Sequence, residues 1–183
     1  MVDLSDVKQR MDGAIEAFKR ELGGLRTGRA SAGLVENVMV EVYGSHMPLP
    51  QVATINVPES RMLSVQVWDQ GNVAAVEKAI MSSGLGLNPS TEGNLIRLPL
   101  PDLTEERRKE LVKVASKYLE QAKVAVRNVR RDGMDLIKKA QKDGDISEDD
   151  ARAESDNVQK MTDNHISKLD EMYEHKEKDI MTI

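Results

Sequence analysis

Hydrophobic residues recur every three or four positions in three long stretches of the chain, the spacing of helices that bury one face. The first stretch spans residues 4–29, with apolar positions at Leu4, Val7, Met11, Ala14, Phe18, Leu22 and Leu25. The second spans about residues 105–142, between a good N-cap, Thr104, and a good stop, Gly144. The third follows the N-cap Ser147 and repeats the pattern at Val158, Thr162, His165, Leu169, Met172 and Ile180.

Between the first two predicted helices the hydrophobic period changes to two. Val38, Val40 and Val42 share one face of a predicted strand, which turns at Gly44-Ser45. The runs QVATINV and MLSVQVW predict two further strands, NVAAVEKAIMSS a short helix, NPSTEGN a turn and LIRL a last short strand. A helix between strands indicates a small α/β unit.

These elements predict an α+β fold, an elongated three-helix bundle with an inserted small β/α/β domain. A helix of about 38 residues is about 57 Å long and cannot bury its apolar face alone. We therefore expect residues 1–30 and 104–183 to form the bundle and residues 31–103 the insert. The two connections are short, and we expect them to act as a hinge built from Ala30, Ser31, Pro101, Asp102 and Thr104.

Composition narrows the class of protein. The 183 residues include no cysteine, so no disulfide or thiolate site is possible and a reducing compartment is expected. The charged first residues do not resemble a signal peptide, and no apolar stretch approaches the roughly 18 residues of a membrane span. We expect a cytoplasmic protein without a membrane partner.

The net charge of −5 hides a strong segregation of charge along the chain. Residues 105–142 carry a net charge of +6, whereas residues 143–183 carry −8. At about 100° per residue, eight cations of the second helix fall within about 60° of Arg127. This basic stripe consists of Lys109, Lys113, Lys123, Arg127, Arg130, Arg131, Lys138 and Lys142.

The basic stripe has two interpretations. It lies away from the predicted buried positions, which are Leu111, Ala115, Tyr118, Ala122, Val129, Leu136 and Ala140. We expect it to face away from the bundle, where the acidic last helix is badly placed to neutralise it, and to bind nucleic acid through phosphates. The stripe contains no aromatic residue, so backbone and shape recognition is expected rather than base stacking. The alternative is a solvated face paired with the acidic last helix.

Six motifs distributed along the whole chain resemble the ribosome recycling factors. They are RTGRAS (26–31), VEKAI (76–80), GLNP (86–89), PLPDLTEERRK (99–109), VAVRNVRRD (124–132) and ISEDD (146–150). The resemblance implies a three-helix bundle with a hinged β/α/β domain. It also implies a monomeric, non-enzymatic factor that binds the large ribosomal subunit after termination and, with elongation factor G and GTP, splits the subunits.

The resemblance also implies which residues contact ribosomal RNA. Arg130 matches the key arginine of the family, and its companions are Arg127, Arg131, Arg26 and Arg29; we add Lys123 from the basic stripe. Gly133 departs from the family, in which many members carry alanine, and it predicts a locally weaker helix.

Other chemistry is poorly supported by the sequence. Residues 143–154 resemble a calcium loop, but Glu148 stands where that loop requires glycine. The three histidines are scattered, and no phosphate-binding glycine motif occurs, so we expect no catalytic residue, metal or cofactor. The remaining alternative function is a coiled-coil adaptor that uses the acidic last helix.

Overall fold

The computed structural model describes residues 2–27 and 29–182 and confirms the α+β class. Its contacts divide the chain into two compact units. The first is Met1–Leu22 with Val112–Lys178, and the second is Gly23–Leu111 with Asp179–Ile183. The domain boundaries expected from the sequence, at 30/31 and 103/104, stay a prediction.

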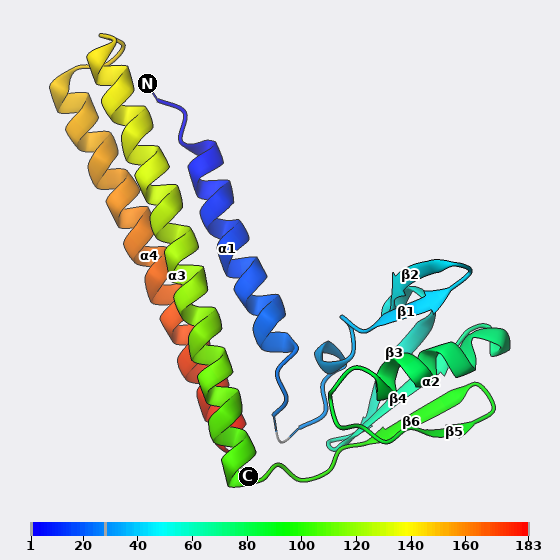
Figure 1. The fold of residues 1–183 in the computed structure, drawn as a ribbon. Helices are drawn as coiled ribbons and strands as arrows, with labels where there is room; N and C mark the ends of the chain where they lie inside the picture. The colour runs from blue at the N-terminus through cyan, green and yellow to red at the C-terminus, as the bar shows by residue number, and fades with distance from the viewer. Residues whose placement is uncertain (1, 28, 183) are drawn as a thin grey trace. The chain divides into compact units, whose positions relative to one another are not determined.

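Helix α1 (Ser5–Gly23) and most of α3 (Glu105–Lys142) and α4 (Glu148–Met181) lie side by side in the first unit (Figure 1). The predicted caps are confirmed. The Thr104 hydroxyl accepts a hydrogen bond from the Arg107 amide at 3.1 Å, and the Ser147 hydroxyl accepts one from the Asp150 amide at 3.0 Å. Gly144 ends α3 with a φ of +80°, a backbone conformation that favours glycine.

The predicted boundary and the predicted buried face of α1 both need correction. The helix ends at Gly23 rather than near residue 29, because adjacent glycines at 23 and 24 favour the helical state least of all residues except proline. Its buried residues include Ile15, whereas Ala14 is only half-buried. The rest of the predicted face is confirmed at Val7, Met11, Phe18 and Leu22.

The buried face of α3 also differs from the prediction. Ala115, Ala122 and Val129 follow a strict seven-residue repeat, and Leu136 would continue it. Instead Leu136 is 48 % exposed and Ile137 is buried, together with Val126. An α-helix has 3.6 residues per turn, so residues seven positions apart gradually rotate away from one face of the helix. An extra step of four residues in place of three corrects this drift and moves the buried position from Leu136 to Ile137.

The shift of the buried face occurs at Gly133, which is itself buried. A Cβ atom at this position would lie 3.3 Å from Cγ2 of Val7 and 3.5 Å from Cγ1 of Val158. Among the described glycines of the bundle, Gly133 is therefore the one that side chains of other helices approach most closely, and these side chains come from α1 and α4.

Polar contacts at the edges of this core tie α1 to the other two helices. Arg10 forms an ion pair with Asp132 of α3 at 2.8 Å. On α4, His165 lies between two acceptors: its Nε2 is 2.7 Å from Oδ1 of Asp12, and its Nδ1 is 2.6 Å from the Met161 carbonyl oxygen. His165, expected in the core, is thus a half-buried polar link between helices.

The second unit is built around two antiparallel sheets. Strands β1 (Met39–Val42) and β2 (Ser45–Pro48) form a hairpin. Strands β3 (Ala53–Glu59), β4 (Met62–Val67), β5 (Ser90–Glu92) and β6 (Leu95–Pro99) pair in the order β3-β4-β6-β5. Helix α2 (Val73–Met81) lies beside them (Figure 1) and shares a core with Val40, Leu63, Val65 and Ile96.

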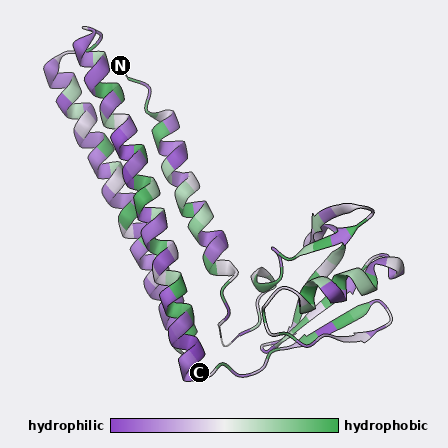
Figure 2. Cartoon of the chain, viewed as in Figure 1, coloured by the Kyte–Doolittle hydropathy of each residue, from purple (hydrophilic) through white to green (hydrophobic). Residues whose placement is uncertain are grey.

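Two strands were missed in the sequence, β2 and β5. Neither contains a buried residue, so neither shows the alternation of hydrophobic and polar residues that indicates a half-buried strand. Figure 2 shows the contrast between the units: hydrophilic residues dominate α3 and α4, whereas hydrophobic residues gather in the strands.

Arg108, near the start of α3, is 8 % exposed and stabilises the end of α4. Its Nη1 donates hydrogen bonds to the carbonyl oxygens of Ile180 at 2.8 Å and Thr182 at 2.6 Å. These bonds satisfy carbonyl groups at a helix C-terminus, where a cation also favours the helix dipole.

Substitution of Gly133 tests the tight approach of the three helices. Gly133→Ala should raise the free energy of unfolding by about 0.5 kcal/mol, because alanine gains about 1 kcal/mol of helix propensity and only the Val7 methyl must move. Gly133→Leu should lower it by about 1–3 kcal/mol through overpacking. Urea unfolding measures both variants; equal destabilisation by alanine and leucine would contradict the geometry.

The Asp12–His165 link makes a prediction for acid stability. The hydrogen bond from His165, followed by that from Lys8, holds the pKa of Asp12 below its ordinary value. The stabilisation is therefore complete above about pH 4 and is lost as the pH falls through the lowered pKa of the folded state. Asp12→Asn should reduce the urea midpoint at pH 7, and the difference from the parent should shrink toward pH 2.

The matched control for this experiment is Glu16→Gln. Glu16 is exposed on the same helix and has no ion pair among the described residues. A destabilisation of the Asp12 variant that stays constant from pH 7 to about pH 2 would show that the carboxylate charge contributes nothing.

Candidate nucleic-acid interface

Four predicted RNA-binding residues lie on the middle turns of α3, and we call them the arginine cluster: Lys123, Arg127, Arg130 and Arg131. Steps of three and four positions bring side chains to one side of a helix. The structure therefore brings these four cations together, as expected from the sequence.

The side chains of Lys123 and Arg130 correct the expected orientation of the basic stripe. Lys123 is only 19 % exposed and its Nζ lies 2.6 Å from Oδ1 of Asp170 on α4. Arg130 is half-buried, and its Nε donates to Oε1 of Gln159, also on α4, at 2.7 Å. One edge of the stripe, at Lys123 and Arg130, thus borders α4 instead of facing away from it, and the acidic helix does neutralise one of its cations.

The contact with Gln159 holds Arg130 in a defined position. Nε2 of Gln159 donates in turn to Oδ1 of Asp163 at 2.9 Å, which fixes the orientation of the amide. Among the described residues, the two Nη groups of Arg130 have no protein partner. These groups are the outer part of the guanidinium fork, which can bind both oxygens of a phosphate.

Arg127 and Arg131 are the exposed members of the cluster. Arg127 lies 3.3 Å from Glu120, but both side chains are more than half exposed, so the ion pair contributes little and is readily exchanged for a ligand. Arg131 is exposed and forms no ion pair in the described part of the chain. Beyond the cluster, Lys113, Lys138 and Lys142 are exposed on α3, while Lys109 pairs with Glu105.

Arg26 and Arg29 belong to the second unit, so the structure does not place them with the arginine cluster. Arg26 donates to the carbonyl oxygen of Pro101, and its Nε is buried without a partner among the described residues. Burial, with the nearby charges of Arg61 and Arg107, lowers the pKa of Arg26. Arg29 is exposed, and Gly28 of the same motif lies outside the described residues.

Two of the expected hinge residues, Ala30 and Asp102, contact one feature that the sequence did not reveal, the turn between β3 and β4. The amide of Ala30 donates to the Ser60 carbonyl oxygen at 2.6 Å, and Asp102 forms an ion pair with Arg61. The hydroxyl of Ser31 accepts a bond from the Gly33 amide at 3.2 Å. Both connections are therefore fastened to two adjacent residues of the second unit.

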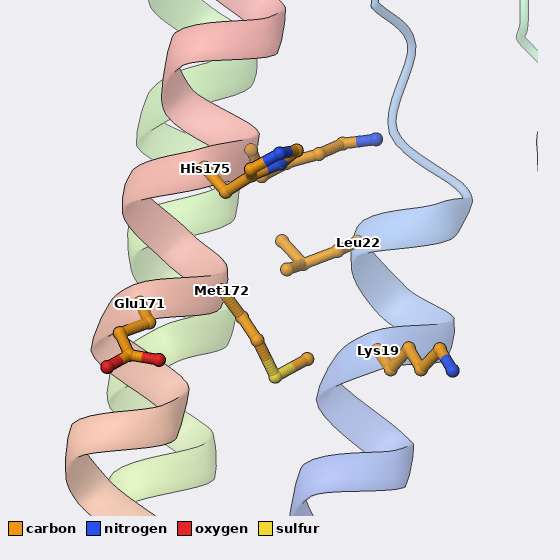
Figure 3. A pocket seen from close by; sticks show the side chains of 6 residues that line it. Lys19, Leu22, Glu171, Met172 and His175 are labelled. Atoms are coloured by element: carbon orange, nitrogen blue, oxygen red, sulfur yellow. The ribbon is translucent and has the colours of Figure 1, made fainter.

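The described residues offer little for catalysis or metal binding. No group of three His, Cys, Asp or Glu residues within them could hold a metal ion. A hollow of about 350 Å³ between α1 and α4 is largely apolar: Leu22 and Met172 project into it, whereas Lys19 points away (Figure 3). Among the described residues, none of the helices combines the length and the hydrophobicity that a membrane-spanning segment requires.

Comparison with known proteins gives one family. A family model described as ribosome recycling factor matches residues 18–181. The ribosome-recycling factor of Azorhizobium caulinodans is 62% identical over 181 residues, which cover 99% of this chain and 97% of that protein. The factor of Rhizobium meliloti is 62% identical over 182 residues, with 100% and 98% coverage.

Solved structures give the same result. A solution structure of the ribosome recycling factor is 46% identical, has a TM-score of 0.75 and covers 100% of both chains. A second match, 44% identical with a TM-score of 0.68, covers 97% of this chain and 96% of the other. It comes from models of the T. thermophilus ribosome recycling factor and the E. coli elongation factor G bound to the E. coli post-termination complex.

The family model spans most of the chain, and the relatives match it over nearly its whole length. Ribosome recycling factors are translation factors and not enzymes. The chain belongs to the ribosome recycling factor family.

Proposed function

We propose that this protein binds the large ribosomal subunit of post-termination complexes in the cytoplasm as a monomer. With elongation factor G, and GTP hydrolysis by that partner, it splits the subunits for a new round of initiation. The observation that carries the proposal is the arginine cluster, in which Arg130 is fixed by Gln159 while its outer nitrogens stay available. Membership of the family supports the choice of partners, the large ribosomal subunit and elongation factor G.

The arginine cluster contacts ribosomal RNA through the phosphate backbone. Arg130 provides the central contact, because a preoriented guanidinium loses less conformational freedom on binding. Arg127 and Arg131 add charge on either side of it, and the weak Glu120 contact of Arg127 gives way to a phosphate. Lys123 shares its charge with Asp170 and contributes less.

Arg26 and Arg29 extend the RNA contact in different ways. Arg29 is exposed and can meet a phosphate directly. Arg26 is held against Pro101 and supports the position of the linker more than it binds RNA.

The two linkers form the hinge through which the action of elongation factor G is transmitted to the interface between the ribosomal subunits. Ala30, Ser31, Pro101, Asp102 and Thr104 are its residues, and the Ser60–Arg61 turn holds the insert's side of both linkers. The backbone then bends between this anchor and the helices, which lets residues 31–103 move relative to the helical bundle.

Variants of Arg130 test the RNA contact. Arg130→Ala should cost no more than about 1 kcal/mol of unfolding free energy, the value of the one hydrogen bond to Gln159. It should weaken large-subunit binding strongly and flatten the log–log salt dependence by about 0.7–0.9 for each phosphate that the side chain no longer neutralises. Arg130→Lys keeps the charge without the fork and should recover only part of the affinity.

Lys142→Ala, at the exposed end of α3, is the matched control and should change affinity much less. The measurements are thermal unfolding and affinity for purified large subunits at several salt concentrations. An Arg130→Ala variant that folds and binds like the parent would remove the proposed contact. A parent protein without ribosome affinity would favour the adaptor function instead.

A disulfide across the hinge tests the role of interdomain motion. The chain has no cysteine, so a cysteine pair with one member in residues 31–103 and the other in the helical bundle is the only possible disulfide. The oxidised variant should bind large subunits with near-parent affinity but split ribosomes slowly, because the hinge is locked. The reduced variant is its own control. Normal splitting by the oxidised form, with disulfide formation verified, would rule out hinge motion as part of the mechanism.

A further inference from the structure

The β1–β2 hairpin carries a tyrosine where its backbone favours asparagine or glycine. Tyr43 and Gly44 form the two-residue turn, with φ values of +53° and +75°. Such a turn is normally built from Asn-Gly or Gly-Gly, and a positive φ disfavours a bulky aromatic residue. The Tyr43 side chain is 78% exposed, so burial does not compensate for this strain.

A second aromatic side chain lies exposed at the same end of the unit. Trp68, the only tryptophan of the chain, follows β4 and is 59% exposed. Its indole N–H donates to the hydroxyl of Thr54 at 2.8 Å, which fixes the ring but buries little of it. Tyr43 and Trp68 are two of the five aromatic residues in the protein, and neither contributes to the core.

Asp69 connects the two aromatic residues. The Tyr43 hydroxyl donates to its Oδ2 at 2.6 Å, the Gly71 amide donates to its Oδ1 at 2.9 Å, and Trp68 precedes it in the chain. The Asn72 amide donates to the Tyr43 hydroxyl at 3.3 Å. These bonds stabilise the carboxylate and lower its pKa, so Asp69 is ionised at neutral pH.

The charge around this site is negative. Residues 31–103 contain seven acidic and three basic side chains, and two of the three, Arg61 and Arg97, already pair with carboxylates. One of the seven, Glu41, is exposed on the strand that leads into the turn, two residues before Tyr43. Such a field repels phosphate, which makes nucleic acid an unsuitable partner.

We propose that Tyr43, Trp68 and Asp69 form a docking site for a basic protein segment, in which an arginine or lysine meets the carboxylate and an aromatic face. Guanidinium groups stack on aromatic rings and pair with carboxylates, and aromatic residues are enriched at protein interfaces. The inference rests on the proposed function only in assigning this segment to a protein of the post-termination complex. The chain would thus bind RNA through its bundle and protein through its insert.

Fluorescence of Trp68 tests the chemistry of the site without ribosomes, because no other tryptophan contributes to the signal. The probes are an arginine-serine peptide, a glutamate-serine peptide and a single-stranded RNA, all without tryptophan or tyrosine. The arginine peptide should change the Trp68 emission in a salt-sensitive manner, and the other two should not. An equal response to RNA or to the glutamate peptide would overturn the proposal.

Two substitutions separate recognition from folding. Tyr43→Asn restores an ordinary turn and should leave the protein at least as stable, yet weaken peptide binding roughly fivefold or more. Asp69→Asn should weaken it similarly. Met81→Ala is the matched control, since Met81 is 64% exposed in the same unit. If both variants are stably folded and bind the peptide as the parent does, the proposal fails.

A photo-crosslinker identifies the partner in the complex. Benzoylphenylalanine replaces Tyr43, or Met81 as the control, in reconstituted complexes of ribosomes and elongation factor G. We expect a crosslink from position 43 to a protein segment that contains arginine or lysine, and Tyr43→Asn should slow splitting while large-subunit affinity stays unchanged. A crosslink to RNA, to a second copy of this chain or to nothing would overturn the proposal. Failure of the parent to bind the subunit would instead contradict the proposed function.

Discussion

The close packing of three helices around Gly133 is the constraint on which the bundle depends. Val7 of α1 and Val158 of α4 both approach this position so closely that a single added carbon would touch them. The buried face of α3 shifts by one residue just after it, from the repeat of Ala122 and Val129 to Ile137. Arg130 lies three residues before Gly133, next to this shift of the buried face.

The orientation of α3 explains how an acidic protein presents a basic surface. Arg130 lies at the border between α3 and α4, where Gln159 holds its Nε by a neutral hydrogen bond. A carboxylate at position 159 would have neutralised the guanidinium, as Asp170 does for Lys123. The acidic helix α4 therefore positions Arg130, neutralises the charge of Lys123 and leaves Arg131 exposed to solvent.

Much of this architecture could be predicted from the sequence, because the apolar repeats and the strong caps of long helices are recognisable in it. Examples are the caps Thr104 and Ser147 and strand β1 (Met39–Val42) with its buried Val40 and Val42. The exposed strands β2 and β5 carry no such pattern, and the shift from Leu136 to Ile137 depends on packing that a helical wheel does not contain. The contacts of Arg130 and Lys123 with α4 were missed for the same reason, and so was the gathering of both linkers at Ser60 and Arg61.

The central claim is that the arginine-bearing side of α3 lies against RNA of the large subunit. Because the chain has no cysteine, one introduced at Gln141, exposed on α3, can carry an iron–EDTA probe alone. A second variant carries the probe at Lys160, exposed on α4. We predict that hydroxyl radicals from position 141 cleave ribosomal RNA of the large subunit and that position 160 gives weaker or no cleavage. Cleavage from position 160 alone, with both variants bound, would contradict this account.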